Sequence, residues 1–165
     1  QAGITVHDRP VVDAAMKRAE ETGAPAAAME LHDGRMVTGK TSDLLGACAA
    51  LLLNALKELA GIPHDRPVIS PAAIEPIQTL KTQYLGSKNP RLHTDEVLIA
   101  LSVSAASDPD AQKALEQLPN LKGCQAHTSV MVGDVDRKQF MKLSVQATFE
   151  AKYENNSVFF PKKGV

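Results

Sequence analysis

Two clusters of cationic and polar residues in this sequence have the chemistry to hold an anion. The first consists of the consecutive residues Gly39, Lys40, Thr41 and Ser42, which come just before a long apolar run. That run, from Leu44 to Ala60, has the composition of a buried helix, and one of the two hydroxyl residues is expected to cap it. The positive end of its dipole would then face Lys40. We therefore predict an anion site at this helix N-terminus.

The same stretch also satisfies a nucleotide-binding pattern. Residues 34–41 match G-x-x-x-x-G-K-T, in which backbone amides wrap the phosphates and the lysine reaches the terminal one. However, Arg35 to Thr38 alternates like a strand returning from a turn at Asp33 and Gly34, whereas a P-loop needs these positions curled around phosphate. Nucleoside triphosphate binding is therefore the less favoured alternative.

The second cluster lies in a polar loop just before a predicted helix from Thr94 to Ala105, and comprises Lys88, Asn89, Arg91 and His93. Such a loop could bind an anion while the histidine acts as acid or base, oriented by Asp95 or Glu96. Thr94 is the expected N-cap, without a capping box, because Val97 occupies the acidic position. The alternative is a solvated polar loop with no ligand.

A third group surrounds Cys124 and His127, whose spacing resembles half of a metal site. No second pair accompanies it, and Cys48 lies within the apolar run, so we predict neither a metal nor a cofactor. His127 and Thr128 are instead expected to line a cleft at the end of a strand. Both cysteines are expected to be reduced.

Composition narrows the class of protein. A length of 165 residues suits a single domain, and a net charge of -1 offers no basic surface for nucleic acid or membranes. Asn54 and Lys57 interrupt the longest apolar run, so no membrane span is expected and the predicted location is cytoplasmic. Aromatic residues make up only 4%, which predicts a core of small and aliphatic side chains.

The order of predicted elements indicates an α/β fold with helices on both faces of a mixed sheet. Beside the two helices named above, we expect helices at Pro10–Glu21, Pro71–Tyr84, Pro109–Leu118 and Asp134–Lys142. The expected strands are Ala26–Leu31, Arg35–Thr38, Pro67–Ser70, Cys124–Val132 and Val145–Glu150. Pro76 could kink its helix. Residues 152–165 are expected to form an extended tail.

Three stretches carry a family resemblance. They are T-G-K-T-S-D-L-L-G-A from Thr38, L-G-S-K-N-P-R-L-H-T-D-E-V-L-I-A-L-S from Leu85, and A-L-E-Q-L-P-N-L-K-G-C-Q-A-H-T-S-V from Ala114. Residues 10–153 resemble the C-terminal part of the bacterial family known as domain of unknown function 1846. The resemblance implies a longer cytosolic protein whose N-terminal domain is missing here, and a homodimer. It also implies a three-layer αβα sandwich of cytidine-deaminase-like topology, without the zinc site. No activity or catalytic residue comes with it.

Two hypotheses of different classes follow. The preferred one is a domain that binds a small phosphorylated or carboxylated metabolite through both cationic clusters. The competing one is a dimerisation module without a site of its own, with Phe159 and Phe160 of the tail lying on another subunit.

Overall fold

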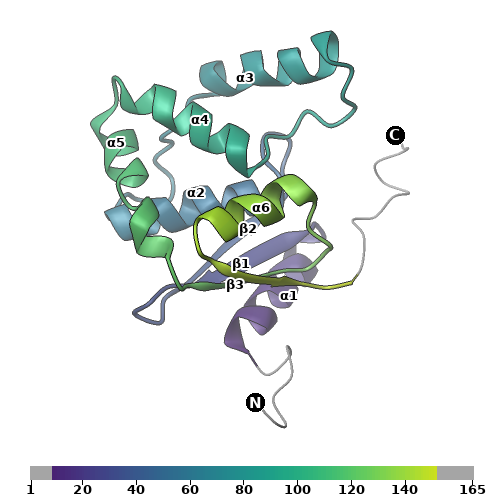
Figure 1. Cartoon of the computed structure of the whole chain (residues 1–165), viewed down its shortest axis with the longest axis vertical. Helices are drawn as coiled ribbons and strands as arrows, with labels where there is room; N and C mark the ends of the chain where they lie inside the picture. Colours follow the sequence, from purple (N-terminus) through teal and green to yellow (C-terminus); the bar gives the residue numbers. More distant parts are fainter. Residues whose placement is uncertain (1–8, 152–165) are drawn as a thin grey trace.

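The computed structural model describes residues 9–151, and this part of the chain folds as a mixed α/β unit of four strands and six α-helices. Figure 1 labels the elements. In chain order they are α1 (Pro10–Thr22), β1 (Ala26–Glu30), β2 (Met36–Lys40), α2 (Ala47–Ala60), α3 (Pro71–Thr79), the π-helical turn η2 (Leu80–Tyr84), α4 (Thr94–Ala105), α5 (Pro109–Leu115), the 3-10 turn η3 (Leu118–Leu121), β3 (Gln125–Thr128), α6 (Asp134–Lys142) and β4 (Gln146–Phe149).

The four strands form one mixed sheet in the order β2-β1-β3-β4. β1 runs antiparallel to both of its neighbours, with Ala28 opposite Thr38 on β2 and opposite His127 on β3. β3 and β4 are parallel. The predicted α/β class and mixed sheet are therefore confirmed.

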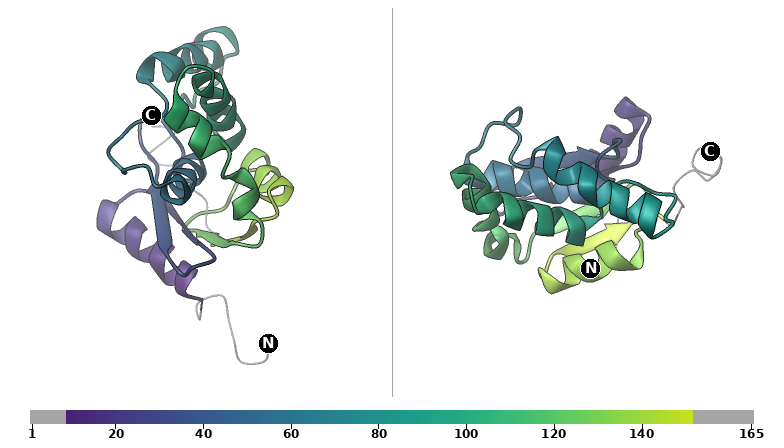
Figure 2. Two further views of the ribbon diagram at one scale, coloured as in Figure 1. Left: turned by 90° about the vertical axis from the view of Figure 1, so that its left-hand side faces the viewer. Right: turned by 90° about the horizontal axis from the view of Figure 1, so that it is seen from above.

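Helices cover both faces of this sheet (Figures 1 and 2). On one face α1 packs on β1 and β3, burying Val11, Val12 and Ala15 against Ala28. On the other face α2 packs on β1 and β2, while α6 contacts β4. The α4 and α5 helices lie over α2 and α3 contacts α4, so a further helical layer encloses α2. Small strand residues let these helices approach closely.

Gly39 marks the closest approach of a helix to the sheet. A Cβ atom added there would lie 2.3 Å from the Leu51 nitrogen and 2.7 Å from its Cα, both in the backbone of α2. Real Cβ atoms do not approach backbone atoms so closely, so the glycine is required by packing. This contact fixes α2 over the strand that leads to it.

The start of α2 differs from the prediction. The helix begins at Ala47, not Leu44, and its N-cap is Gly46, not Thr41 or Ser42. The Ser42 hydroxyl accepts hydrogen bonds from the amides of Leu44 (3.3 Å) and Leu45 (3.2 Å), which makes a local turn before the helix. A serine hydroxyl can bind nearby backbone amides in place of the helical bonds. The helix therefore covers only part of the apolar run from Leu44 to Ala60.

Two predicted strands also need correction. Residues 67–70 form no strand, although Val68 and Ile69 are buried in the core. The predicted strand Cys124–Val132 is paired only over Gln125–Thr128, and a bond from the Ser129 amide to the Ala26 carbonyl (2.8 Å) follows it at the end of β1. The predicted tail, with Phe159 and Phe160, lies outside the described residues.

Helix α3 begins at Pro71 and carries Pro76 inside it. It continues into the π-helical turn, where the Leu85 amide donates to the Leu80 carbonyl over five residues (3.0 Å). Across residues 9–151, every helix is too short or too polar to cross a membrane.

Candidate functional site

A pocket of about 300 Å³ lies where segments far apart in the sequence meet. Thr41 reaches it from the end of β2 and Thr128 from the end of β3. Residues 46–48 at the start of α2 and residues 130–136, which lead into α6, form two further walls. The loop before α4 completes it with Asn89, Arg91 and His93. The pocket therefore combines residues from both of the predicted clusters.

Three α-helices of the described chain begin at this pocket. The N-caps of α2, α4 and α6 are Gly46, His93 and Gly133, and all three residues line it. No side chain caps α2 or α6 by hydrogen bonding. Since each helix N-terminus carries partial positive charge, their convergence favours a bound anion.

The loop before α4 is tied to the segment before α2. The Leu92 amide donates to the Leu44 carbonyl (2.9 Å), and the Gly46 amide donates to the Leu92 carbonyl (3.1 Å). The Arg91 guanidinium donates through Nε to the Ser42 carbonyl. These bonds bring the two predicted clusters side by side, across 49 residues of sequence.

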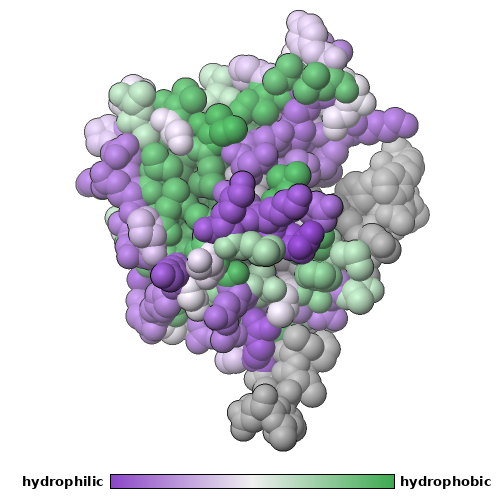
Figure 3. Space-filling model, in the orientation of Figure 1, coloured by the Kyte–Doolittle hydropathy of each residue, from purple (hydrophilic) through white to green (hydrophobic). Residues whose placement is uncertain are grey.

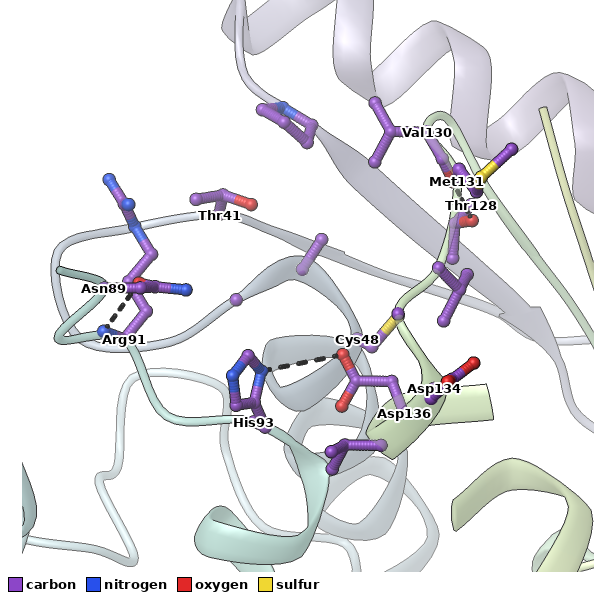
Figure 4. Close-up of a pocket in the computed structure, with 16 residues that line it drawn as sticks. Thr41, Cys48, Asn89, Arg91, His93, Thr128, Val130, Met131, Asp134 and Asp136 are labelled. Atoms are coloured by element: carbon purple, nitrogen blue, oxygen red, sulfur yellow. Dashed lines mark hydrogen bonds and ion pairs between the residues drawn. The ribbon is translucent and has the colours of Figure 1, made fainter. Parts of the chain in front are cut away.

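Figure 4 shows how the polar side chains are arranged around the pocket. Asn89, Arg91 and Thr41 lie on one side, while Val130 and Met131 lie on the other. The Asn89 side-chain oxygen accepts from the Arg91 amide (3.0 Å), which leaves the side-chain NH₂ directed toward the pocket (Figure 4). One wall thus supplies hydrogen-bond donors, and the other supplies an apolar surface beside the carboxylates of Asp134 and Asp136.

His93 pairs with a residue that the sequence did not indicate. Its Nδ1 lies 3.9 Å from Asp136 Oδ2 on α6 (Figure 4), whereas we expected Asp95 or Glu96 to orient the ring. Asp136 is itself held by Thr94, whose amide (2.9 Å) and hydroxyl (2.7 Å) both donate to Oδ1. The carboxylate therefore joins the start of α6 to the start of α4.

This arrangement also changes the predicted cap of α4. Because Thr94 is engaged with Asp136, the N-cap falls one residue earlier, at His93. Glu96 then occupies the third helical position and accepts from the His93 amide (2.8 Å). The expectation that no capping box forms was wrong, since the box is counted from His93.

Cys48 is a pocket residue that sequence reasoning assigned to the core. It lies in the first turn of α2, lines the pocket and is 7% exposed. Neither cysteine forms a disulfide bond. Cys124 lies elsewhere, at the start of β3, where burial raises the pKa of its thiol. The two thiols therefore have different environments.

Five residues of the predicted sites lie outside the pocket lining, namely Gly39, Lys40, Ser42, Lys88 and His127. Lys40 is exposed at the end of β2, and Lys88 is exposed in the loop before α4. Gly39 is buried under α2. Ser42 approaches the site through its carbonyl, which binds Arg91.

His127 is fully buried inside the sheet region and does not line the pocket. Its Nε2 lies 2.8 Å from Glu150 Oε2, and its Nδ1 lies 2.7 Å from the Thr148 hydroxyl. The neighbouring Thr128 does line the pocket, because successive strand residues face opposite sides.

The nucleotide-binding pattern falls on strand structure. Met36 to Lys40 pair residue by residue with β1, so the amides that would wrap a phosphate lie in a regular antiparallel ladder. The match to the P-loop pattern is accidental. Among the described residues, no three histidine, cysteine or acidic side chains gather as a metal site.

Comparisons with known proteins agree on one family. The model of the domain of unknown function DUF1846, C-terminal, matches residues 7–159. A UPF0371 protein from Corynebacterium glutamicum (strain R) is 58% identical over 159 residues, which is 96% of this chain and 32% of the relative. A UPF0371 protein from Streptococcus thermophilus (strain ATCC BAA-491 / LMD-9) is 48% identical over 157 residues, which is 95% and 32% of the two chains. The chain thus spans about a third of the length of these curated relatives.

Proposed function

This chain belongs to the DUF1846 C-terminal domain family, and we propose that it binds a small phosphorylated or carboxylated metabolite in the pocket where α2, α4 and α6 begin. One observation carries this proposal: three helix N-termini meet at one pocket, which Arg91 also lines. Each of these features favours negative charge.

The polar wall supplies the groups that would hold the anion. Arg91 offers a fork of donors suited to phosphate or carboxylate, and Asn89 adds its side-chain NH₂. Thr41 contributes a hydroxyl from the end of β2. Of the predicted residues, the proposal therefore rests on the four that line the pocket: Thr41, Asn89, Arg91 and His93. Lys40 and Lys88 do not line it.

The pocket volume and its second wall limit the ligand. About 300 Å³ lies at the lower end of the range for ligand pockets, so it suits a single small metabolite rather than a dinucleotide. Val130, Met131 and Val132 form an apolar surface opposite the donors. We therefore expect a ligand with an anionic group and a carbon body.

Thermal denaturation of the purified protein with inorganic phosphate, sugar phosphates, nucleoside monophosphates and dicarboxylates tests this proposal. Arg91→Ala is expected to weaken binding at least about tenfold, since a hydrogen bond to a charged group contributes roughly 1.5 to 3 kcal/mol. Lys88→Ala is the matched control, because it removes an exposed cation from the same loop. The proposal is wrong if no anion stabilises the wild type, or if Arg91→Ala responds like Lys88→Ala.

A dimerisation module is the second candidate, and exposed apolar side chains support it. Large ones gather on η2 and α4, at Leu80, Tyr84, Leu85, Ile99 and Val103. Figure 3 shows hydrophobic surface on this face of the molecule, over α4 and at the end of α3. Light scattering across a concentration series tests it, with Ile99→Asp expected to lower the apparent mass of any dimer. A monomer at all concentrations would refute it.

The finer topology stays a prediction. The order of helix, hairpin and later helix and strand pairs supports a cytidine-deaminase-like arrangement without zinc. The cytoplasmic location and the absence of nucleic acid or membrane partners stay predictions as well, supported by the even charge balance.

A further inference from the structure

On the turn η2, a lysine points inward while its large apolar neighbours are exposed. The side chain of Lys81, on η2, is 9% exposed, although its neighbours Leu80, Tyr84 and Leu85 are 49%, 77% and 71% exposed. Lysine is almost never buried unless it is paired. A buried lysine among exposed apolar residues is the reverse of the usual burial pattern, so it needs a structural explanation.

The backbone of η2 supplies that cause. The turn is π-helical, and its wider spacing is closed by the bond from the Leu85 amide to the Leu80 carbonyl. The Ser87 amide then returns to the Lys81 carbonyl (2.8 Å), which fixes the exit of the chain. A π-helical turn shifts the angular position of the residues within it relative to an α-helix. Here Lys81 faces the loop that leads to α4.

The ammonium of Lys81 contacts both sides of the pocket segment 91–93. It donates to the Arg91 carbonyl and lies 2.9 Å from Glu96 Oε1. The same carboxylate oxygen accepts from the His93 amide (2.8 Å). Lys81 thus holds Arg91 directly and holds His93 through Glu96.

The other side of this segment is held by the backbone of Leu92 and by the bond from Arg91 Nε to the Ser42 carbonyl. Leu92 is fully buried and is bonded in both directions to the segment that precedes α2. Segment 91–93 therefore lies between a backbone bridge to residues 44–46 and the Lys81–Glu96 pair. Its two side chains in the pocket, Arg91 and His93, depend on both supports.

We infer that Lys81 is a positioning residue for the pocket, holding Arg91 and His93 at the mouth where the anion would bind. This inference rests on the proposed function only for its effect on affinity. Without the ammonium, the Arg91 carbonyl and one Glu96 oxygen would lose a buried partner, and the segment would shift to reach water. A purely structural salt bridge would change global stability without changing this segment in particular.

Amide hydrogen exchange tests the inference without a ligand. In Lys81→Met, we expect the amides of Leu92, His93 and Gly46 to exchange at least tenfold faster, while the β1–β2 ladder changes no more than global stability requires. Lys81→Arg should restore most of the protection, because it keeps a charged donor. Lys88→Met, an exposed lysine in the same loop, is the control and should match the wild type.

Phosphate binding to the same variants provides the second measurement. We expect Lys81→Met to weaken it about fivefold and Lys81→Arg less than twofold. If wild type binds no phosphate, the proposed function fails, while hydrogen exchange still decides the role of Lys81. If wild type binds and Lys81→Met has unchanged local exchange and affinity, the inference fails and the proposed function stands.

If Lys81→Met folds poorly, a second variant tests the same inference. Glu96→Gln keeps an oxygen for the His93 amide but removes the charge that pairs with Lys81. Faster exchange confined to residues 91–93 and 44–46 would support the inference. Uniform acceleration across the chain would overturn it.

Discussion

Two regions of this molecule each contain one cysteine and one histidine, with opposite environments. At β3, Cys124 and His127 are three residues apart in sequence, yet both are buried and each has its own partners. At the pocket, Cys48 and His93 are 45 residues apart, yet they line the same 300 Å³ space. Cys124 and His127 are close in sequence but share no pocket lining, whereas the fold brings Cys48 and His93 together from distant parts of the sequence.

The difference lies in how completely each histidine is paired. His127 is fully buried, with a partner at under 3 Å on each ring nitrogen. His93 has a side chain that is 39% exposed, and its carboxylate partner is 3.9 Å away. A completely paired buried ring stabilises the fold, whereas a loosely paired ring at a pocket is available to a ligand.

The largest effect is expected from replacing the buried histidine. His127→Ala should lower the free energy of unfolding by about 3 kcal/mol, because it leaves the Glu150 carboxylate and the Thr148 hydroxyl without the ring between them. Urea denaturation measures this loss. His93→Gln should lower it by less than about 0.5 kcal/mol, as for other partly exposed positions. Equal losses in the free energy of unfolding would show that the two histidines do not differ in their contribution to stability.

The cysteines should differ about tenfold in their rate of alkylation. Cys48 borders the pocket, whereas Cys124 is 2% exposed and has a raised pKa, so less of its thiolate form is present near neutral pH. Peptide mass spectrometry after limited iodoacetamide treatment would give both rates in one sample. A bound anion should slow the labelling of Cys48 alone, and faster labelling of Cys124 would contradict the assignment.

Asp136 should affect stability and binding in opposite directions. Asp136→Asn keeps an oxygen for Thr94 but loses its charge, so we expect a loss of about 1 kcal/mol in the free energy of unfolding. Removing a negative charge from the pocket should strengthen phosphate binding about twofold. Asp43→Asn is the control, since Asp43 is an exposed carboxylate outside the pocket lining. Weaker phosphate binding in Asp136→Asn would place the anion away from this residue.

The smallest effect is expected at Lys40. The sequence made this residue the main cation of the site, but it is exposed and outside the pocket lining. Lys40→Ala should change phosphate affinity by less than about twofold, since exposed charges are screened by water and salt. Titration calorimetry would resolve this, and a tenfold loss would restore the site predicted from sequence.

Local patterns predicted most of the helices. Helical periodicity and helix-ending residues located α1, α4 and α6 to within a residue or two. Pro67–Ser70 was wrong because apolar residues such as Val68 and Ile69 become buried without pairing as a strand. Strands depend on partners that lie far away in sequence, so their bounds are harder to predict.

The site could be predicted only in part, for the same reason. Arg91, Asn89 and His93 were indicated because cationic and polar residues precede a helix start. Asp136 was missed because its link to Thr94 crosses 42 residues and leaves no local signal. Cys48 was missed because an apolar run conceals that its first turn opens onto a pocket.

Gly39 has a consequence for the width of the pocket. Its missing side chain lets the backbone of α2 lie directly on β2, and α2 begins at the pocket wall. Any larger residue at position 39 would push the helix away from the strand, and so move its first turn relative to the wall formed by residues 130–136. A substitution at position 39 would therefore change the pocket indirectly, by moving α2. Even alanine there would force the backbone of α2 to shift, and so alter the pocket without changing any residue that lines it.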